Sequence, residues 1–267
     1  MKQLITIVAL LLSTNIFAWE QKPPQPIQNC QAQAPYGLPK TANHFVSICR
    51  HAYVTAYDAS AKLPVWTSYT LTPPNALGCF PRTNAFAADA SIENGPRPDD
   101  YVGTGYDKGH VAPDGDMSFD ERAEYESFLM TNMMPQLGGL NRGIWKLLET
   151  SIRGWAVQLN NSFTVYAGPI YGQGDKTIGD GVIVPHAFYK IVVNNHTGAA
   201  AGWLFKHEGG QGNDLTKARA PIKQIQALSG IQFGFPTKVK ELDPGHEWPV
   251  DYGALTNAKR AKCGRNE

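Results

Sequence analysis

Strands are the clearest feature in the pattern of apolar and polar residues along the chain. Between residues 52 and 72, aromatic and β-branched residues recur at every second position on either side of the polar segment 58–62. This alternation predicts a β-hairpin. Later runs rich in β-branched and aromatic residues predict further strands at residues 163–170, 182–184, 188–193 and 199–205, with a glycine-rich turn over 172–181.

Helical periodicity is strongest over residues 143–153. The apolar residues of this segment form one stripe, made of Ile144, Leu147, Leu148 and Ile152. Such a stripe predicts an amphipathic helix. Residues 118–129 have apolar residues at roughly helical spacing and predict a short helix or an irregular segment. A further helix is predicted over residues 222–228, ending before Gly230.

Strands in both halves of the chain, with helices between them, favour an α+β fold. We expect a mainly antiparallel central sheet flanked by helices. The length allows one large domain or two small ones. The sequence has no internal repeat and no long low-complexity linker apart from the Pro- and Gln-rich residues 21–33. A single domain over residues 19–267 is therefore the simpler prediction.

Residues 1–18 have the pattern of a secretory signal peptide. A basic residue at position 2 precedes the apolar run 4–12, and the small residue Ala18 precedes Trp19. The run is shorter than the about 20 apolar residues of a membrane span. We expect an exported protein, secreted or periplasmic, with no membrane anchor after signal removal. A buried N-terminal helix and an uncleaved anchor are the alternatives.

The cysteines also favour an oxidising compartment. Four cysteines, an even number, follow the signal peptide, which predicts two disulfides with three open pairings. If Cys30 pairs with Cys49, then Cys79 pairs with Cys263 and ties the C-terminal tail to the region before Arg82. There is no Cys-x-x-Cys pair, so a zinc site or a redox motif is not predicted.

The charge balance excludes binding of nucleic acid through overall charge. The chain has 24 Lys and Arg against 23 Asp and Glu, and removal of residues 1–18 takes away Lys2 and leaves 23 of each. Proteins that bind nucleic acid through overall charge are basic. Acidic residues are concentrated between positions 89 and 126, and basic residues between 217 and 265. Any binding of a polyanion must therefore be local.

Candidate chemistry is concentrated between residues 107 and 149. His110 is a candidate general base, because an imidazole accepts a proton near neutral pH. Asp107 lies three residues earlier, and a tight turn at Gly109 would let its carboxylate orient the ring or the water shell of a metal ion. Asn141 offers an amide oxygen of the kind that Mg²⁺ accepts. Glu149, about 12 Å further along a helix, would reach such an ion through water.

A base, oxygen ligands and nearby cations suit hydrolysis of a phosphodiester by water. Each short motif taken alone is more often a solvated turn. Asp114-Gly115-Asp116 is likewise interpreted as a turn, because it lacks the spacing and the closing glutamate of a calcium loop. Trp145 is interpreted as a core residue or a wall of the site, and His186 and Lys190 as structural residues.

Three segments in this order resemble the signature of the DNA/RNA non-specific endonuclease family, the ββα-metal nucleases that include endonuclease G. That signature reads Asp-Arg-Gly-His, then Asn-x-x-Pro-Gln, then Asn-x-x-x-Trp-x-x-x-Glu. The matching positions are residues 107–110, residues 132–136, and Asn141, Trp145 and Glu149. The resemblance covers roughly residues 50–235.

The resemblance implies a role for each matching residue. His110 corresponds to the general base, Asn141 to the direct Mg²⁺ ligand, and Glu149 to the carboxylate that holds the ion through water. Asp107 corresponds to the acidic member of the signature, and Asn132 to the amide that organises the site.

Phosphate binding is implied for two cations. Arg82, with a phenylalanine and an aspartate downstream at positions 86 and 89, is the best match for the family's phosphate-binding arginine. Lys108 stands where the family usually has arginine. Lysine keeps the charge but lacks the planar fork that binds two phosphate oxygens.

The resemblance implies a Mg²⁺-dependent, sugar-non-specific endonuclease with a ββα-metal unit, acting on DNA and RNA and leaving 5′-phosphate ends. Together with the signal pattern of residues 1–18, it leads us to expect an exported enzyme. Mn²⁺ or another divalent ion would substitute for Mg²⁺. An inhibitor protein or a homodimer partner leaves no mark in the sequence. The alternatives are an exported phosphodiesterase that acts on small substrates, and a disulfide-stapled binding protein with a relic site.

Overall fold

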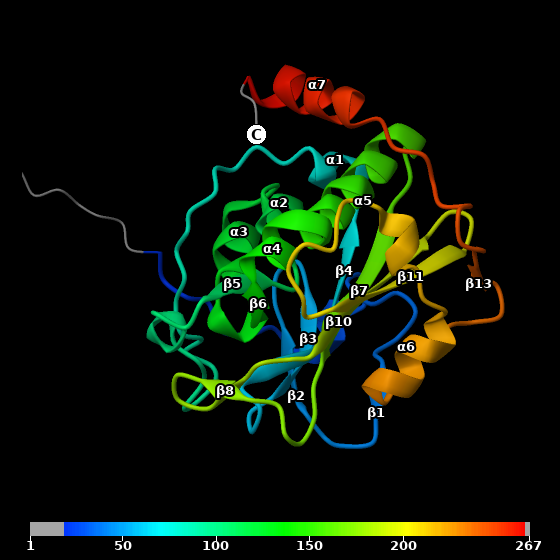
Figure 1. Cartoon of the computed structure of the whole chain (residues 1–267). Coiled ribbons are helices and arrows are strands. Elements are labelled where there is room, and N and C mark those ends of the chain that lie inside the picture. Colours follow the sequence, from blue (N-terminus) through cyan, green and yellow to red (C-terminus); the bar gives the residue numbers. More distant parts are fainter. Residues whose placement is uncertain (1–18, 265–267) are drawn as a thin grey trace, which may run out of the picture.

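A seven-stranded sheet forms the centre of the computed structural model, which describes residues 19–264 (Figure 1). The strand order is β13-β11-β10-β7-β4-β3-β2, and all neighbouring pairs are antiparallel except β11 with β13. The strands of this sheet are β2 (Val46–Cys49), β3 (Val54–Asp58), β4 (Leu63–Leu71), β7 (Phe163–Ile170), β10 (Ala187–Asn194), β11 (Ala199–Lys206) and β13 (Lys240–Glu241).

Three two-stranded ladders and several helices surround this sheet. The ladders pair β1 (Lys40–Thr41) with β12 (Ile231–Gln232), β5 (Tyr106–His110) with β6 (Met133–Leu137), and β8 (Thr177–Ile178) with β9 (Val182–Ile183). The α-helices are α1 (Pro73–Ala76), α2 (Asp114–Met117), α3 (Glu121–Ser127), α4 (Gly138–Leu140), α5 (Lys146–Leu159), α6 (Ile222–Ser229) and α7 (Tyr252–Cys263). The other helical turns are η1 (Ile27–Cys30), η2 (Pro98–Tyr101), η3 (Met130–Asn132), the π-helical η4 (Asn141–Trp145) and η5 (Leu215–Ala218).

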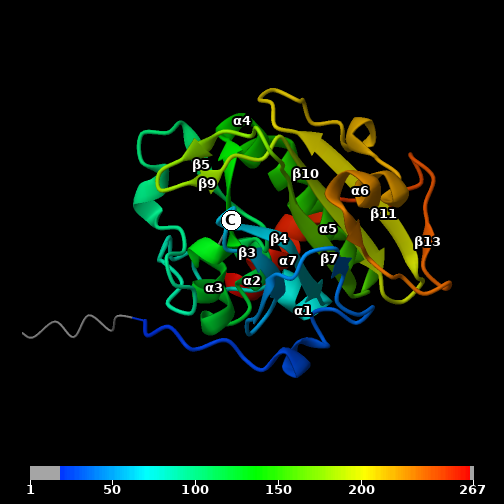
Figure 2. The same ribbon diagram turned by 90° about the horizontal axis from the view of Figure 1, so that it is seen from below.

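The sheet is buried on both faces, which explains why its central strands are apolar at almost every position. All residues of β7 are buried. In β10, Phe188 and Val192 join the core on one face, whereas Tyr189 and Ile191 join the core on the other, as alternation along a strand requires. The first face carries α5 and the β5–β6 ladder, and α6 packs on the second. Figure 2 shows β5 and β9 on the opposite side of the molecule from α6 and β13.

The ββα unit expected from the sequence is present. β5 and β6 form its two strands, and the chain then continues through α4 and η4 into α5. The helix predicted over 143–153 begins later, at Lys146, and ends later, at Leu159. Gly143 interrupts the helical path before it, because its φ of −98° and ψ of −119° are not helical. Asn141 and Glu149 therefore do not lie on one regular helix, so the rise of a regular helix does not apply between them.

The other predicted elements agree with the structure within about two residues at their ends. The 52–72 hairpin is β3 and β4, the predicted strand 163–170 is β7, and the short helix within 118–129 is α3. Gly230 ends α6 in the left-handed conformation, with a φ of 70°. The turn predicted at 114–116 was wrong, because these residues begin the single helical turn α2. The sequence also gave no prediction of α7.

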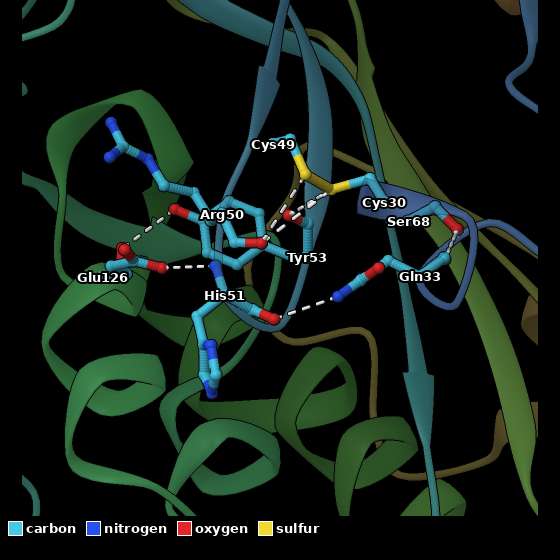
Figure 3. Close-up of a disulfide and its surroundings, with 8 residues drawn as sticks. All are labelled: Cys30, Gln33, Cys49, Arg50, His51, Tyr53, Ser68 and Glu126. Carbon is cyan, nitrogen blue, oxygen red and sulfur yellow. Dashed lines mark hydrogen bonds between the residues drawn. A yellow bond between two sulfur atoms is a disulfide. The ribbon is translucent and has the colours of Figure 1, made fainter. Parts of the chain in front are cut away.

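Two disulfides are present, Cys30–Cys49 and Cys79–Cys263. The first lies beside the buried side chains of Arg50 and Tyr53, next to Glu126 (Figure 3). In this region the Tyr53 hydroxyl donates to the Glu126 carbonyl at 2.9 Å. The pairing that the sequence left open is thus the one that ties α7 to the region before Arg82.

The predicted signal peptide, residues 1–18, lies outside the described residues. Within residues 19–264, no helix has the length and apolar character needed to cross a membrane.

Candidate active site

A cleft of about 570 Å³ brings together five of the seven residues predicted for the site. Arg82, Lys108, His110, Asn141 and Glu149 all line it. The two others lie beside the cleft. Asp107 contacts Asn141, and Asn132 contacts the backbone that follows His110. The cleft is built on the β5–β6 ladder, η4 and α5, with the loop around residue 82 on its edge.

The β5–β6 ladder explains why the motifs have glycine at position 109 and glutamine at position 136. Gly109 pairs with Met134 in an extended strand, so the tight turn expected at Gly109 was wrong. A Cβ at this position would lie 2.0 Å from Oε1 of the fully buried Gln136. Glycine is needed because the Gln136 side chain crosses over the backbone here. His110 and Lys108 then lie on the same side of β5, since side chains alternate along a strand.

The His110 imidazole is buried in an aromatic surround. The rings of Phe128 and Phe86 lie with their centroids 4.8 and 5.7 Å from its own. Its Nε2 is a buried atom without a hydrogen-bond partner among the described residues. Burial lowers the pKa of His110 to about 4, with the cations Arg82 and Lys190 adding to the effect and Asp114 opposing it. The ring is therefore neutral at physiological pH, as a general base requires.

Asp107 accepts a hydrogen bond from Asn141. One expectation was that it would orient the His110 ring, and the structure places it on Asn141 instead. The Asn141 Nδ2 donates to Asp107 Oδ2 at 3.0 Å, and the Arg142 Nε lies 3.4 Å from the same oxygen. A carboxylate accepts hydrogen bonds only, so the amide nitrogen of Asn141 must face Asp107. The amide oxygen of Asn141 is thereby turned away from Asp107, and the residue lines the cleft.

Glu149 projects from α5 and is 8% exposed. Its Oε1 lies 3.3 Å from Nζ of Lys190, which is fully buried in β10. The Lys190 ammonium also lies 3.9 Å from the centre of the Trp145 ring. Burial raises the pKa of Glu149 to about 7, although Lys190 opposes the rise. Burial lowers the pKa of Lys190, and Glu149 opposes that change.

Lys190 was correctly predicted to be structural rather than to approach the substrate, but its contact with Glu149 was missed. A signal for it exists in the sequence. Lys190 is the one charged residue in the apolar run 188–193, and a lysine in a strand covered on both faces requires an acidic partner. Trp145 is a buried core residue whose ring packs against the Lys190 ammonium. Its interpretation as a core residue is therefore confirmed.

Asn132 holds the backbone around the site. Its Nδ2 donates to the carbonyls of Ala112 and Ser127, each at 2.8 Å, and its Oδ1 accepts from the Ala112 amide at 3.0 Å. The side chain is fully buried and does not line the cleft. It fixes the backbone just after His110, which fits an organising role better than direct contact with a substrate.

Arg82 is held on the edge of the cleft by three neighbours. Its guanidinium pairs with Asp114, its Nε donates to Asn84 Oδ1 at 2.8 Å, and it lies 4.9 Å from the centre of the Phe128 ring. The group remains partly exposed, with 45% of the side chain accessible. Lys108 lies nearby, its Nζ 5.1 Å from the centre of the Phe86 ring. Both cations can therefore meet an anion in the cleft.

The downstream aspartate of the Arg82 segment has a different function. Asp89 is buried, pairs with Arg50 at 2.5 Å, and accepts from the Thr131 hydroxyl at 2.6 Å. Phe86, in contrast, contacts His110. The segment thus divides into a part at the cleft and a part that fixes the loop to the core.

Asp114 was missed as a residue of the cleft when residues 114–116 were interpreted as a turn. Asp114 lines the cleft, and although burial raises its pKa, His110 and Arg82 hold it below its usual range. Asp116 is buried and accepts from the Tyr69 hydroxyl and from Arg153, both at 2.8 Å. His186, by contrast, is exposed and pairs with Asp175 outside the cleft, as its structural interpretation implied.

The charge of the cleft differs from that of the whole chain. Six Lys or Arg side chains line it against two acidic ones, Asp114 and Glu149. The six are Arg82, Lys108, Arg142, Lys146, Arg153 and Lys259. A concave surface lined by one sign of charge concentrates ions of the opposite sign. The local binding of a polyanion that the balanced composition demanded is therefore available here.

The donors of the cleft fit a magnesium-type ion better than zinc. The oriented amide oxygen of Asn141 and the buried carboxylate of Glu149 are hard oxygen donors, and Mg²⁺ binds few protein ligands and keeps several waters. Over residues 19–264 there is no group of three or more His, Cys, Asp and Glu residues arranged to hold a metal ion. The chemistry of these donors therefore fits a hard divalent ion, and Mg²⁺ itself stays a prediction.

Comparisons with known proteins identify the family. The family model described as DNA/RNA non-specific endonuclease matches residues 33–240. Nuclease C1 of Cunninghamella echinulata var. echinulata is 28% identical over 225 residues, which are 77% of this chain and 88% of that protein. The human mitochondrial nuclease EXOG is 27% identical over 222 residues. These cover 75% of this chain but only 59% of the human protein.

The fold agrees as well. A crystal structure of the EndoG/EndoGI complex, described as showing the mechanism of EndoG inhibition, matches with a TM-score of 0.70 and 25% identity. The match covers 78% of this chain and 92% of that chain. The family model matches most of the chain, and the three signature segments lie around one cleft. The chain therefore belongs to the DNA/RNA non-specific endonuclease family and is a nucleic-acid-hydrolysing endonuclease.

Proposed function

We propose that this protein is an exported, Mg²⁺-dependent, sugar-non-specific endonuclease that hydrolyses both DNA and RNA, and that residues 19–267 form its single catalytic domain. The observation that carries the proposal is a neutral buried imidazole, an oriented amide, a carboxylate and several cations around one cleft. The same groups are those that hydrolysis of a phosphodiester requires.

His110 is the proposed general base. Its buried Nε2 has no hydrogen-bond partner among the described residues and is neutral well below pH 7. It would accept the proton of the attacking water as the oxygen bonds to phosphorus. Departure of the 3′-oxygen would leave a 5′-phosphate and a 3′-hydroxyl end.

Asn141 would hold Mg²⁺ directly and Glu149 would hold it through water, with Mn²⁺ or another divalent ion able to substitute. When bound, the ion supplies positive charge that stabilises the phosphorane and the leaving oxygen. Asp107 would keep the Asn141 oxygen aimed at the ion, because it occupies the amide nitrogen. Lys190 would keep the Glu149 carboxylate ionised and in place.

Arg82 and Lys108 would bind the phosphate. Contacts to phosphate and sugar carry no direct information on base sequence, which supports broad specificity. Lys108 provides charge without the two-pronged geometry of arginine. A weaker hold on the phosphate than in members with arginine is therefore part of the proposal.

The test is digestion of supercoiled plasmid, single-stranded DNA and RNA, with Mg²⁺ and with EDTA. The proposal expects cleavage of all three with Mg²⁺ and of none in EDTA. His110→Ala should lower the rate about 10²- to 10⁴-fold. His186→Ala is the matched control, because His186 is exposed and pairs with Asp175 outside the cleft. Religation of cut plasmid without a kinase would establish the 5′-phosphate.

Two other functions are outcomes of the same test. Hydrolysis of small phosphodiesters with intact plasmid and RNA would favour the small-substrate phosphodiesterase. Binding of nucleic acid without any hydrolysis would favour the relic site, for which Lys108 in place of arginine is the available argument.

Export and partners rest on separate grounds. Export rests on the pattern of residues 1–18, whereas the human relative is named mitochondrial. Mass spectrometry of protein from the periplasm or the medium tests it, because signal removal would leave Trp19 as the first residue. The similar structure is of EndoG in a complex that inhibits it. An inhibitor protein or a homodimer stays a prediction for this chain.

A further inference from the structure

The C-terminal helix α7 forms one wall of the cleft, although the family model ends before it. Lys259 and Cys263 of α7 line the cleft together with Arg82 and His110. The family model matches residues 33–240, whereas α7 covers Tyr252–Cys263. This wall therefore lies outside the segment that the family model matches.

The helix is anchored at both of its ends. At its start, the Tyr252 and Ser151 hydroxyls lie 2.8 Å apart, and the Gln158 side chain bonds with the backbone of Asp251 at 2.6 and 3.1 Å. At its end, Cys263 is bonded to Cys79. Figure 1 shows α7 lying along α5 and α1 at one end of the molecule. The position of α7 is therefore fixed relative to α5, which carries Glu149.

The disulfide joins α7 to the loop that carries the proposed phosphate-binding arginine. Cys79 is three residues before Arg82, and the lining of the cleft runs through Gly78, Phe80 and Pro81. α7 and this loop therefore border the same end of the cleft. A polynucleotide whose scissile phosphate lies near Arg82 would meet α7 with one of its neighbouring phosphates.

The side chain that α7 presents to the cleft is a cation. Lys259 is 7% exposed. Burial raises the pKa of Glu124, and the charge of Lys259 opposes that rise. Glu124 also accepts a hydrogen bond from the Thr83 amide at 3.0 Å. Lys262, on the same helix, is exposed, donates to the Pro74 carbonyl at 3.0 Å, and is not part of the cleft lining. One helix thus offers a cation at the cleft and a matched cation away from it.

We propose that α7, held by the Cys79–Cys263 disulfide, is a binding wall for the backbone of a polynucleotide next to the scissile phosphate, with Lys259 as its phosphate contact. This inference rests on the proposed nuclease function. It assigns to the C-terminal extension a role in holding polymers, in addition to the chemistry at His110.

The test measures binding of a fluorescent DNA duplex in EDTA over a series of salt concentrations, in a His110→Ala background that prevents cleavage. Each phosphate contact contributes about 0.9 to the slope of log affinity against log salt. Lys259→Gln should lower the slope by about 0.9, so the loss of affinity between 50 and 200 mM salt becomes about threefold to fourfold smaller. Lys259→Arg should keep the slope, and Lys262→Gln should leave it unchanged.

The disulfide gives a second, independent variant. Cys79→Ser with Cys263→Ser should weaken duplex binding and lower the slope, because α7 is released at one end. Cys30→Ser with Cys49→Ser is the control, since that disulfide does not line the cleft. Thermal unfolding establishes that each variant is folded, and the cysteine pair serves as the test if Lys259→Gln does not fold.

An unchanged slope in both Lys259→Gln and the Cys79–Cys263 variant would overturn the wall, as would equal effects of Lys259→Gln and Lys262→Gln. No measurable duplex binding in the parent would overturn it too. The proposed function fails by a different result, the absence of cleavage by the unmodified protein.

Discussion

Replacement of Lys190 by methionine separates the stability of the buried ion pair from its effect on the proposed metal site. Methionine is close to lysine in shape and removes only the ammonium. Loss of one partner of a buried pair usually costs about 3–5 kcal/mol, because the other partner stays charged and buried. Here burial has already raised the pKa of Glu149 to about 7. Glu149 can therefore take up a proton near neutral pH at little cost.

The expected loss of stability at pH 6 is accordingly small, about 2 kcal/mol, mostly from the lost contact between the Lys190 ammonium and the Trp145 ring. Above pH 7 the loss should grow. A carboxyl whose pKa is raised by folding contributes less stability as the pH rises through its folded value. Without Lys190 that value rises further, so the variant loses about 1.4 kcal/mol more per pH unit above 7 until Glu149 ionises.

The metal requirement should change in the same direction. The proposed hold on Mg²⁺ would need the ionised form of Glu149, so each unit of rise in the Glu149 pKa should raise the Mg²⁺ concentration for half-maximal activity about tenfold at pH 7. Urea unfolding in EDTA at pH 6–9 and Mg²⁺ titration of activity are the two assays. The Glu149→Gln, Lys190→Met double variant is the control. Relative to Glu149→Gln alone, its loss of unfolding free energy should not change with pH.

Two results would refute this reasoning. A stability loss above about 3 kcal/mol at pH 6 would mean that Glu149 stays charged without its partner. An unchanged Mg²⁺ requirement in a folded variant would mean that Lys190 does not act on the ion through Glu149.

Three further predictions concern the neighbours of this pair. Asp107→Ala should raise the Mg²⁺ requirement about 10- to 100-fold, because the acceptor that fixes the Asn141 amide is removed; a normal Mg²⁺ titration would argue against this role of the contact. Gly109→Ala should cost about 1–3 kcal/mol by urea unfolding, because the new Cβ meets Gln136, and Gln136→Ala in the same chain should recover part of it. Folding lowers the pKa of His110 from about 6.5 to about 4, so the unfolded chain binds more protons between these values. Relative to a His110→Ala chain, the parent should therefore lose about 3 kcal/mol of stability as the pH drops from 6.5 to 4, and an equal pH dependence of the two chains would contradict this.

The sheet could be predicted from the sequence because its burial leaves a local mark. A strand covered on both faces is apolar along its length, as in β7, and the 52–72 hairpin shows alternation around a polar turn. The interrupted helix before α5 leaves no such mark. Gly143 takes a non-helical conformation inside a segment whose apolar spacing is helical, so periodicity alone placed the helix start too early.

Most of the predicted site residues line the cleft, because the motifs specify them together. Their partners could not be predicted, since these come from elements far apart in the chain. Lys190 reaches Glu149 from β10. Asp107 was expected to orient the His110 ring or the water shell of a metal ion, whereas it contacts Asn141. Lys259 lines the cleft because the Cys79–Cys263 disulfide holds its helix there, and the sequence left that pairing open.

The central claim is that His110 and an ion held by Asn141 face each other across one cleft. Anomalous diffraction from a crystal of the protein soaked in Mn²⁺ tests this most directly. We expect one strong peak within bonding distance of Asn141 Oδ1, linked through a water to Glu149 and facing His110 Nε2. A peak elsewhere with none in this cleft, at a Mn²⁺ concentration that supports cleavage, would contradict it.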